Sequence, residues 1–171
     1  SQVQANTVFK PGESDAAVIR LREQNEKNKN KVFSGVAASV DCNSRWVFLD
    51  PFRGTIAAVA ESARNVSCVG AEPVAITNNL NFPSPETDIG YWQLSSSCNG
   101  ISEACKALET PVTGGNVSLY NESKNKENEI TPINPTPVIG MVGKIDNVEK
   151  AISSEWKNID DQIWLIGSYK S

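Results

Sequence analysis

The chain has 171 residues, of which 39% are hydrophobic and 21% charged, values typical of a globular protein with a sizeable core. A net charge of -4 argues against nucleic acid as the main partner, because phosphate backbones are bound by clustered Lys and Arg. No apolar run is long enough to span a bilayer and the start has no signal-peptide pattern. We therefore expect a cytoplasmic protein with no nucleic-acid and no membrane partner.

The absence of histidine limits the chemistry further. Histidine is the commonest general base and a member of the usual nucleophilic triads, so neither is available within this chain. The cysteines form no Cys-x-x-Cys pair and indicate reduced, partly buried side chains, at Cys42, Cys68, Cys98 and Cys105. If an enzyme is involved, this chain does not hold its whole catalytic set.

The chain starts with a polar, extended stretch at residues 1–7, and a charged, solvent-facing connection is predicted at residues 22–31. Short apolar runs bounded by turn residues predict six strands, at residues 16–21, 32–40, 46–49, 73–80, 111–120 and 135–145. Apolar residues at helical spacing predict a helix at 55–69, which Gly70 ends. A second helix is predicted at 89–108, with one buried stripe formed by Leu94, Cys98, Ile101, Cys105 and Leu108.

The segment after the fifth strand, residues 121–129, is charged and polar and is predicted to be mobile. Beyond residue 145 the character changes: a charged helical piece at 148–156 leads to an isolated apolar run at 162–167. We interpret that run as the first strand of a following domain. The predicted organisation is a domain at residues 1–145, followed at 146–171 by a linker and the start of a truncated C-terminal domain.

The strand at residues 111–120 carries the pattern most typical of a binding site, TGGNVSLY at residues 113–120. Two glycines allow a ligand to approach the backbone closely, and Asn116 and Ser118 lie on one side of an extended strand. An amide oxygen suits a hard cation and a hydroxyl suits a phosphate or substrate oxygen. A β-bulge with turn-capping polar residues would explain the same pattern without a ligand. The pattern matches neither a Walker loop nor a Rossmann fingerprint.

Several collinear segments resemble the synthetase subunits of the phosphoribosylformylglycinamidine synthase (PurL) family. They cover nearly the whole chain, at residues 1–3, 6–8, 54–65, 70–77, 80–82, 91–93, 110–123 and 135–143. The sequence GGNVSLYN at residues 114–121 is typical of the second of the two related synthetase halves in that family. Selenophosphate, thiamine-phosphate and aminoimidazole ribonucleotide synthetases share the domain type, but residues 80–82 and 114–120 argue against them.

The resemblance implies an α+β fold, a PurM N-terminal-like domain with a mixed or antiparallel four-stranded-type sheet covered by helices. Such domains pair through their sheets into a barrel-like dimer. The implied reaction is ATP-dependent: formylglycinamide ribonucleotide and glutamine-derived ammonia give the amidine, ADP and phosphate. The implied partners are the remaining domains of the synthetase, a glutaminase subunit and a small accessory subunit. The fragment itself is expected to be inactive and is able to homodimerise.

Carried over by position, the resemblance makes Asn78 and Gly115 nucleotide contacts, Asn116 a magnesium ligand and Ser118 a substrate contact. The family's catalytic histidines belong to the first half, so no catalytic residue is assigned in this chain. Asn78 departs from the aspartate usual in the family, which removes a charge that would attract Mg²⁺. The alternative is therefore an auxiliary half that holds nucleotide and stabilises the pseudo-dimer without turnover.

Overall fold

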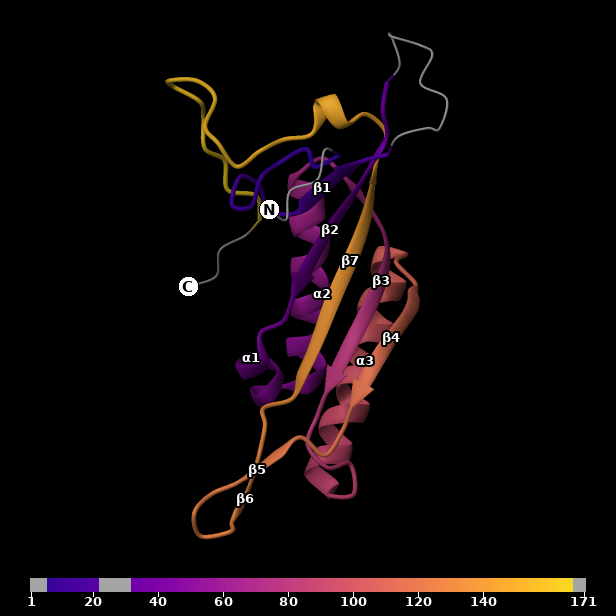
Figure 1. The fold of residues 1–171 in the computed structure, drawn as a ribbon, viewed down its shortest axis with the longest axis vertical. Coiled ribbons are helices and arrows are strands. Elements are labelled where there is room, and N and C mark those ends of the chain that lie inside the picture. Colours follow the sequence, from indigo (N-terminus) through magenta and orange to yellow (C-terminus); the bar gives the residue numbers. More distant parts are fainter. Residues whose placement is uncertain (1–5, 22–31, 168–171) are drawn as a thin grey trace.

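A computed structural model describes residues 6–21 and 32–167, in which five strands form one mixed sheet (Figure 1). The order across the sheet is β1 (Ala17–Arg20), β2 (Gly35–Asp41), β7 (Thr136–Ile145), β3 (Glu72–Asn81) and β4 (Val112–Ser118). The first four strands pair antiparallel, and β3 and β4 pair parallel. The α+β fold expected from the sequence is confirmed, with five strands in the sheet.

The two long helices α2 (Pro51–Cys68) and α3 (Asp88–Leu108) cover the same face of this sheet (Figure 1). Helix α3 is the crossover between the parallel strands β3 and β4, which cannot be joined by a tight turn. The apolar core lies between α2 and the sheet, where Val59, Ile139 and Met141 are completely buried. This core holds the middle of the sheet in place.

The two helices approach each other closely through small residues. A Cβ atom added at Gly100 of α3 would lie 2.5 Å from the carbonyl oxygen of Phe52, so only glycine fits there. The buried side of α3 is consequently made of Gln93, Ser97, Gly100, Ile101, Ala104 and Cys105. The predicted stripe was wrong at Cys98 and Leu108, which are exposed. Helix α3 contacts α2 through other positions, such as Ser97 and Gly100.

The strand predicted at residues 46–49 was also wrong, because these residues form the helix α1 (Ser44–Leu49). The side chain of Asn43 accepts a hydrogen bond from the Trp46 backbone and so begins the helix. Gly54 of α2 lies against α1, since a Cβ there would come within 2.5 Å of the Val47 nitrogen. A run of four apolar residues does not distinguish a strand from a short helix.

Two further segments differ from the expected local structure. Residues 121–129, predicted to be mobile, include β5 (Glu122–Lys124), which pairs with β6 (Ile130–Pro132) in a hairpin beyond the end of the main sheet (Figure 1). Instead of a helix at 148–156, only a 3-10 turn forms at Val148–Lys150. The apolar run at 162–167 has no strand, and Ile163, Trp164, Leu165 and Ile166 are highly exposed.

The predicted connection at residues 22–31 lies outside the described residues, as does most of the predicted extended start at residues 1–7. Within the described ranges, no helix is both long and apolar enough to cross a membrane. The sheet face opposite the helices has no covering element in this part of the chain, and Ile19 and Val40 on it are 50% and 73% exposed. Both that face and the β4 edge are therefore open.

Candidate functional site

The site predicted from the sequence lies where β3 and β4 run side by side. Their register pairs Asn78 with Gly115, Asn79 with Asn116 and Asn81 with Ser118. Paired residues on neighbouring strands lie on the same face of a sheet, and successive residues alternate between faces. Asn78 and Gly115 therefore lie on the face that the helices cover, and Asn116 and Ser118 lie on the open face.

A β-bulge precedes these positions on β4. Ile76 pairs with Val112 and Thr77 pairs with Gly114, so Thr113 has no counterpart on β3. Two side chains stabilise the bulge: the Thr113 hydroxyl donates to the Ile76 carbonyl at 3.1 Å, and the Thr77 hydroxyl donates to the Gly114 carbonyl at 3.1 Å. The bulge considered in the sequence analysis is present, and it coexists with the clustering of the four candidate residues.

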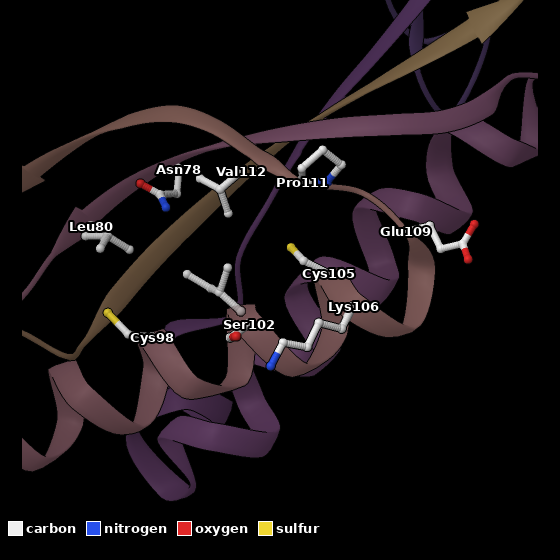
Figure 2. Close-up of a pocket in the computed structure, with 10 residues that line it drawn as sticks. Asn78, Leu80, Cys98, Ser102, Cys105, Lys106, Glu109, Pro111 and Val112 are labelled. Carbon is white, nitrogen blue, oxygen red and sulfur yellow. The ribbon is translucent and has the colours of Figure 1, made fainter.

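On the helix side, a cavity of about 560 Å³ lies between α3 and the strands β3 and β4 (Figure 2). Asn78, Leu80 and Val112 point into it from the sheet, and Cys98 and Cys105 point toward it from α3 (Figure 2). The lining is mostly apolar, and its polar residues are Asn78, Ser102, Lys106 and Glu109. A cavity of this size and character suits a small planar ligand.

The closest backbone approach in the site is at Gly115. A Cβ atom added there would lie 2.6 Å from the carbonyl oxygen of Asn78 and would also overlap its side-chain oxygen. Gly114 next to it has nothing within 4 Å of the same position. Of the two glycines, only Gly115 is required by the space available, and it allows the Asn78 amide to lie across the β4 backbone.

On the open face, the amide of Asn116 donates to the Asn79 side-chain oxygen at 3.2 Å. Among the described residues, the Asn116 side-chain oxygen has no hydrogen-bond partner, so it is free to bind a cation. One neutral oxygen is a partial site, and no group of three His, Cys, Asp or Glu that could hold a metal occurs in the described ranges. Mg²⁺ is commonly bound by few protein ligands together with phosphates and water, which fits this arrangement.

Ser118 ends β4, and its hydroxyl donates to the side-chain oxygen of Asn121 at 3.2 Å. The loop that follows is tied to the loop after β3: the Asn121 backbone donates to Phe82, and the Tyr120 hydroxyl donates to Glu86 at 3.1 Å. The bond to Glu86 raises the pKa of the Tyr120 phenol. Asn79 and Asn121 were missed by the sequence analysis, because their roles arise from contacts with Asn116 and Phe82, 37 and 39 residues away along the chain.

The cysteines contribute no nucleophile. All four are free, and burial raises the pKa of Cys98 and Cys105. Burial, together with the charge of Glu61, raises the pKa of Cys42 to about 11. The raised pKa keeps the thiols of Cys42, Cys98 and Cys105 protonated near neutral pH, which makes these three poor nucleophiles and poor metal ligands. The partial burial predicted for all four holds at Cys42, whereas Cys105 is buried and Cys68 and Cys98 are exposed.

Known proteins similar to this chain agree with the resemblance seen in the sequence. The chain is 94% identical over all 171 residues to the phosphoribosylformylglycinamidine synthase subunit PurL of Prochlorococcus marinus strain MIT 9312. The identity to the same subunit of strain NATL1A is 62% over 167 residues, which is 97% of the chain. The chain spans 22% and 21% of the length of these two relatives.

Solved structures give the same result. PurL of Thermotoga maritima complexed with ATP is 37% identical with a TM-score of 0.70, over 86% of this chain and 22% of that one. The same protein complexed with FGAR is 35% identical with a TM-score of 0.66, over 86% of this chain and 21% of that one. The family described as "AIR synthase related protein, N-terminal domain" matches residues 13–145, which is most of the chain. The chain therefore belongs to the AIR synthase-related N-terminal domain family.

Proposed function

We propose that this chain is the N-terminal-type domain of the second synthetase half of a phosphoribosylformylglycinamidine synthase. That enzyme makes formylglycinamidine ribonucleotide from formylglycinamide ribonucleotide, ATP and ammonia in purine biosynthesis. The observation that carries the proposal is the grouping of Asn78, Gly115, Asn116 and Ser118 on paired strands, in a chain with 94% identity to a segment of such a synthase. The domain contributes contacts to ligands, and the catalytic acid–base groups lie elsewhere in the enzyme, because this chain has no histidine.

The nucleotide contacts in this proposal are Asn78 and Gly115. Their support is the apolar cavity beside Asn78 and the unobstructed backbone at Gly115. An apolar wall suits a nucleotide base, and an exposed backbone suits a sugar or phosphate that must approach closely. ATP supplies the phosphoryl group that activates the substrate amide, and the residues of this chain bind and orient the nucleotide for that transfer.

Magnesium binding is proposed at Asn116, as one ligand among phosphate and water oxygens. The free side-chain oxygen described above supports it. Asn116 lies on the face opposite to Asn78 and Gly115, so the proposed ion meets the nucleotide phosphates at the exposed β4 edge. Mg²⁺ retains several waters and takes few protein ligands when it is bound with a nucleotide. The role of Asn116 is to fix the ion at the margin of the sheet.

Ser118 is proposed to contact the ribonucleotide substrate. The enzyme is further proposed to be cytoplasmic and to include the remaining synthetase domains, a glutaminase subunit and a small accessory subunit. The open face of the sheet, with Ile19 and Val40 exposed, is proposed to pair with a second domain of the same type into a barrel-like dimer. Residues 146–171 are proposed to comprise a linker and the first strand of the domain that follows residues 1–145, with that strand at residues 162–167.

Ser118→Ala in the full-length synthase tests the proposed function. With ammonia as nitrogen donor, we expect the KM for formylglycinamide ribonucleotide to rise about three- to tenfold, the value of one hydrogen bond, with kcat unchanged. Ser123→Ala is the matched control, because its hydroxyl bonds only to the Thr131 carbonyl within the β5–β6 hairpin. Unchanged kinetics in Ser118→Ala would refute the substrate role.

One observation favours an auxiliary function as the second candidate. Asn78 is an amide at a position where the resemblance expects a carboxylate, and the described residues offer no carboxylate cluster for a metal. Asn78→Asp in the full-length enzyme distinguishes the two functions. A change in the KM for ATP indicates a catalytic nucleotide site, whereas a change in thermal stability with unaltered kinetics indicates an auxiliary one.

A further inference from the structure

Asn121, the first residue after the β4 loop, makes an unusually complete set of hydrogen bonds at the end of the site. Its side-chain nitrogen donates to the Ser118 carbonyl at 2.7 Å and to the Phe82 carbonyl at 3.2 Å. Its backbone nitrogen also donates to Phe82, and its carbonyl accepts from the Ile133 nitrogen. Phe82 is completely buried in the core. Asn121 is thus anchored to the core on one side and to the end of β4 on the other.

These contacts fix which end of the Asn121 amide faces Ser118. The two carbonyl oxygens can only accept hydrogen bonds, so the group beside them must be the amide nitrogen. The amide oxygen is therefore the end that meets the Ser118 hydroxyl, at 3.2 Å. That oxygen can only accept, so the hydroxyl proton of Ser118 is directed toward Asn121.

The direction of this proton determines what Ser118 can bind. A hydroxyl that donates its single proton to Asn121 has only its lone pairs left for a ligand. Phosphate oxygens that carry no proton are acceptors and cannot pair with those lone pairs, whereas ribose hydroxyls and amide N–H groups are donors. Ser118 is partly exposed, so a ligand can reach it.

We propose that Asn121 is a positioning residue that holds the Ser118 hydroxyl as a hydrogen-bond acceptor. Ser118 consequently contacts a donor group of the substrate, a ribose hydroxyl or an amide N–H, and does not bind its phosphate. This inference rests on the proposed function, in which Ser118 contacts the ribonucleotide. It adds that the substrate is the hydrogen-bond donor in that contact and that Asn121 determines this.

The first part of the test is a double-mutant cycle in the full-length synthase, with ammonia as nitrogen donor. We expect Asn121→Ala and Ser118→Ala each to raise the KM for formylglycinamide ribonucleotide about three- to tenfold with kcat unchanged. The double variant should be no worse than Ser118→Ala alone, since Asn121 acts through Ser118. Asn125→Ala is the control: Asn125 also bonds several neighbours, but only within the hairpin turn.

The second part needs no variant of Asn121 and so remains valid if Asn121→Ala does not fold. Inhibition constants are measured for three substrate analogues with the wild type and with Ser118→Ala. One analogue lacks the 5′-phosphate, one lacks the ribose hydroxyls, and one has methylated amide nitrogens. We expect Ser118→Ala to raise the inhibition constant of the analogue without phosphate. For one of the other two analogues the inhibition constant should be unchanged, and the group which that analogue lacks is the donor.

The outcomes separate the inference from the proposed function. If Ser118→Ala has no effect on KM, the proposed substrate contact is wrong and the inference falls with it. Two results would overturn the inference while the substrate contact stands, provided that Ser118→Ala raises KM. In the first, Ser118→Ala weakens the binding of every analogue except the one without phosphate. In the second, it weakens the binding of both analogues that lack a donor. An Asn121→Ala penalty that is equally large in the Ser118→Ala background also overturns the positioning role.

Discussion

The middle of the sheet and its β3–β4 margin are built in opposite ways. Under α2, strands β2 and β7 bury apolar side chains completely, as at Ala37, Ile139 and Met141. At the margin, every residue of β4 from Val112 to Val117 is exposed, and a cavity separates α3 from the strands. The same sheet is close-packed in one part and open in the other, although the strands are hydrogen-bonded throughout.

This difference separates stability from ligand binding. Buried apolar area supplies most of the folding free energy, so the α2 side holds the fold together. The margin buries less apolar area and leaves backbone and amide groups exposed, as the proposed ligand contacts require. Substitutions in the two regions should therefore change different measurements, and three experiments test that division.

The largest expected effect is on stability, from Ile139→Ala in the middle of the sheet. Ile139 is completely buried, and its truncation leaves a space that the core cannot fill. We expect the free energy of unfolding, measured by urea denaturation, to fall by about 2–5 kcal/mol. Val138→Ala on the open face is the control and should cost much less. Equal losses at the two positions would show that burial under α2 is not what stabilises the middle of the sheet.

A smaller effect is expected at the margin, from Gly115→Ala. The added methyl group overlaps the Asn78 side chain and lies 2.6 Å from its carbonyl oxygen, so β3 and β4 must move apart. We expect a loss of about 1–3 kcal/mol in unfolding free energy and a raised KM for ATP in the full-length enzyme. Gly114→Ala has free space and should change neither quantity appreciably. A similar result for both glycines would show that close approach at Gly115 is unimportant.

The smallest effect concerns the link between the two loops at the margin. The hydrogen bond to Glu86 raises the pKa of Tyr120 above its ordinary value of 10.0. Because the folded pKa is higher than the unfolded one, the stabilisation is complete below the unfolded pKa and is lost as pH rises through the folded pKa. Ultraviolet titration should show the Tyr120 pKa falling toward 10.0 in Glu86→Ala, with Tyr120→Phe identifying the signal. An unchanged titration would mean that the bond does not form in solution.

The places of the five sheet strands and both long helices along the chain followed from periodicity and turn residues. What the sequence could not reveal was how segments meet in space. The run from Trp46 to Leu49 is apolar enough for a strand. It forms a helix because Asn43 caps its start and Gly54 of α2 allows it to pack closely. Likewise, Cys98 fits an apolar stripe in sequence, yet it lines the cavity between α3 and the strands and is exposed.

For the site, the spacing correctly indicated that Asn116 and Ser118 share one side of the strand. It could not indicate that Asn78 pairs with Gly115 on the opposite face, because that depends on the register between two strands. The role of Asn121 was equally hidden, since it arises from a contact with Phe82 39 residues earlier. Local patterns identified which residues are suited to ligand binding. The contacts of those residues depend on strand register and on segments that are distant in the sequence.

Thr113, which has no counterpart on β3, allows Val112 and Gly115 to face α3 together. The two residues are three positions apart, and in a regular strand residues three apart lie on opposite faces. A strand without the bulge would therefore either remove Val112 from the cavity wall or rotate Asn116 and Ser118 into the helix layer. One extra residue lets a single strand serve two surfaces at once. Shortening β4 by Thr113 should preserve this division, whereas removing one residue between Gly115 and Ser118 should reverse the orientation of Ser118.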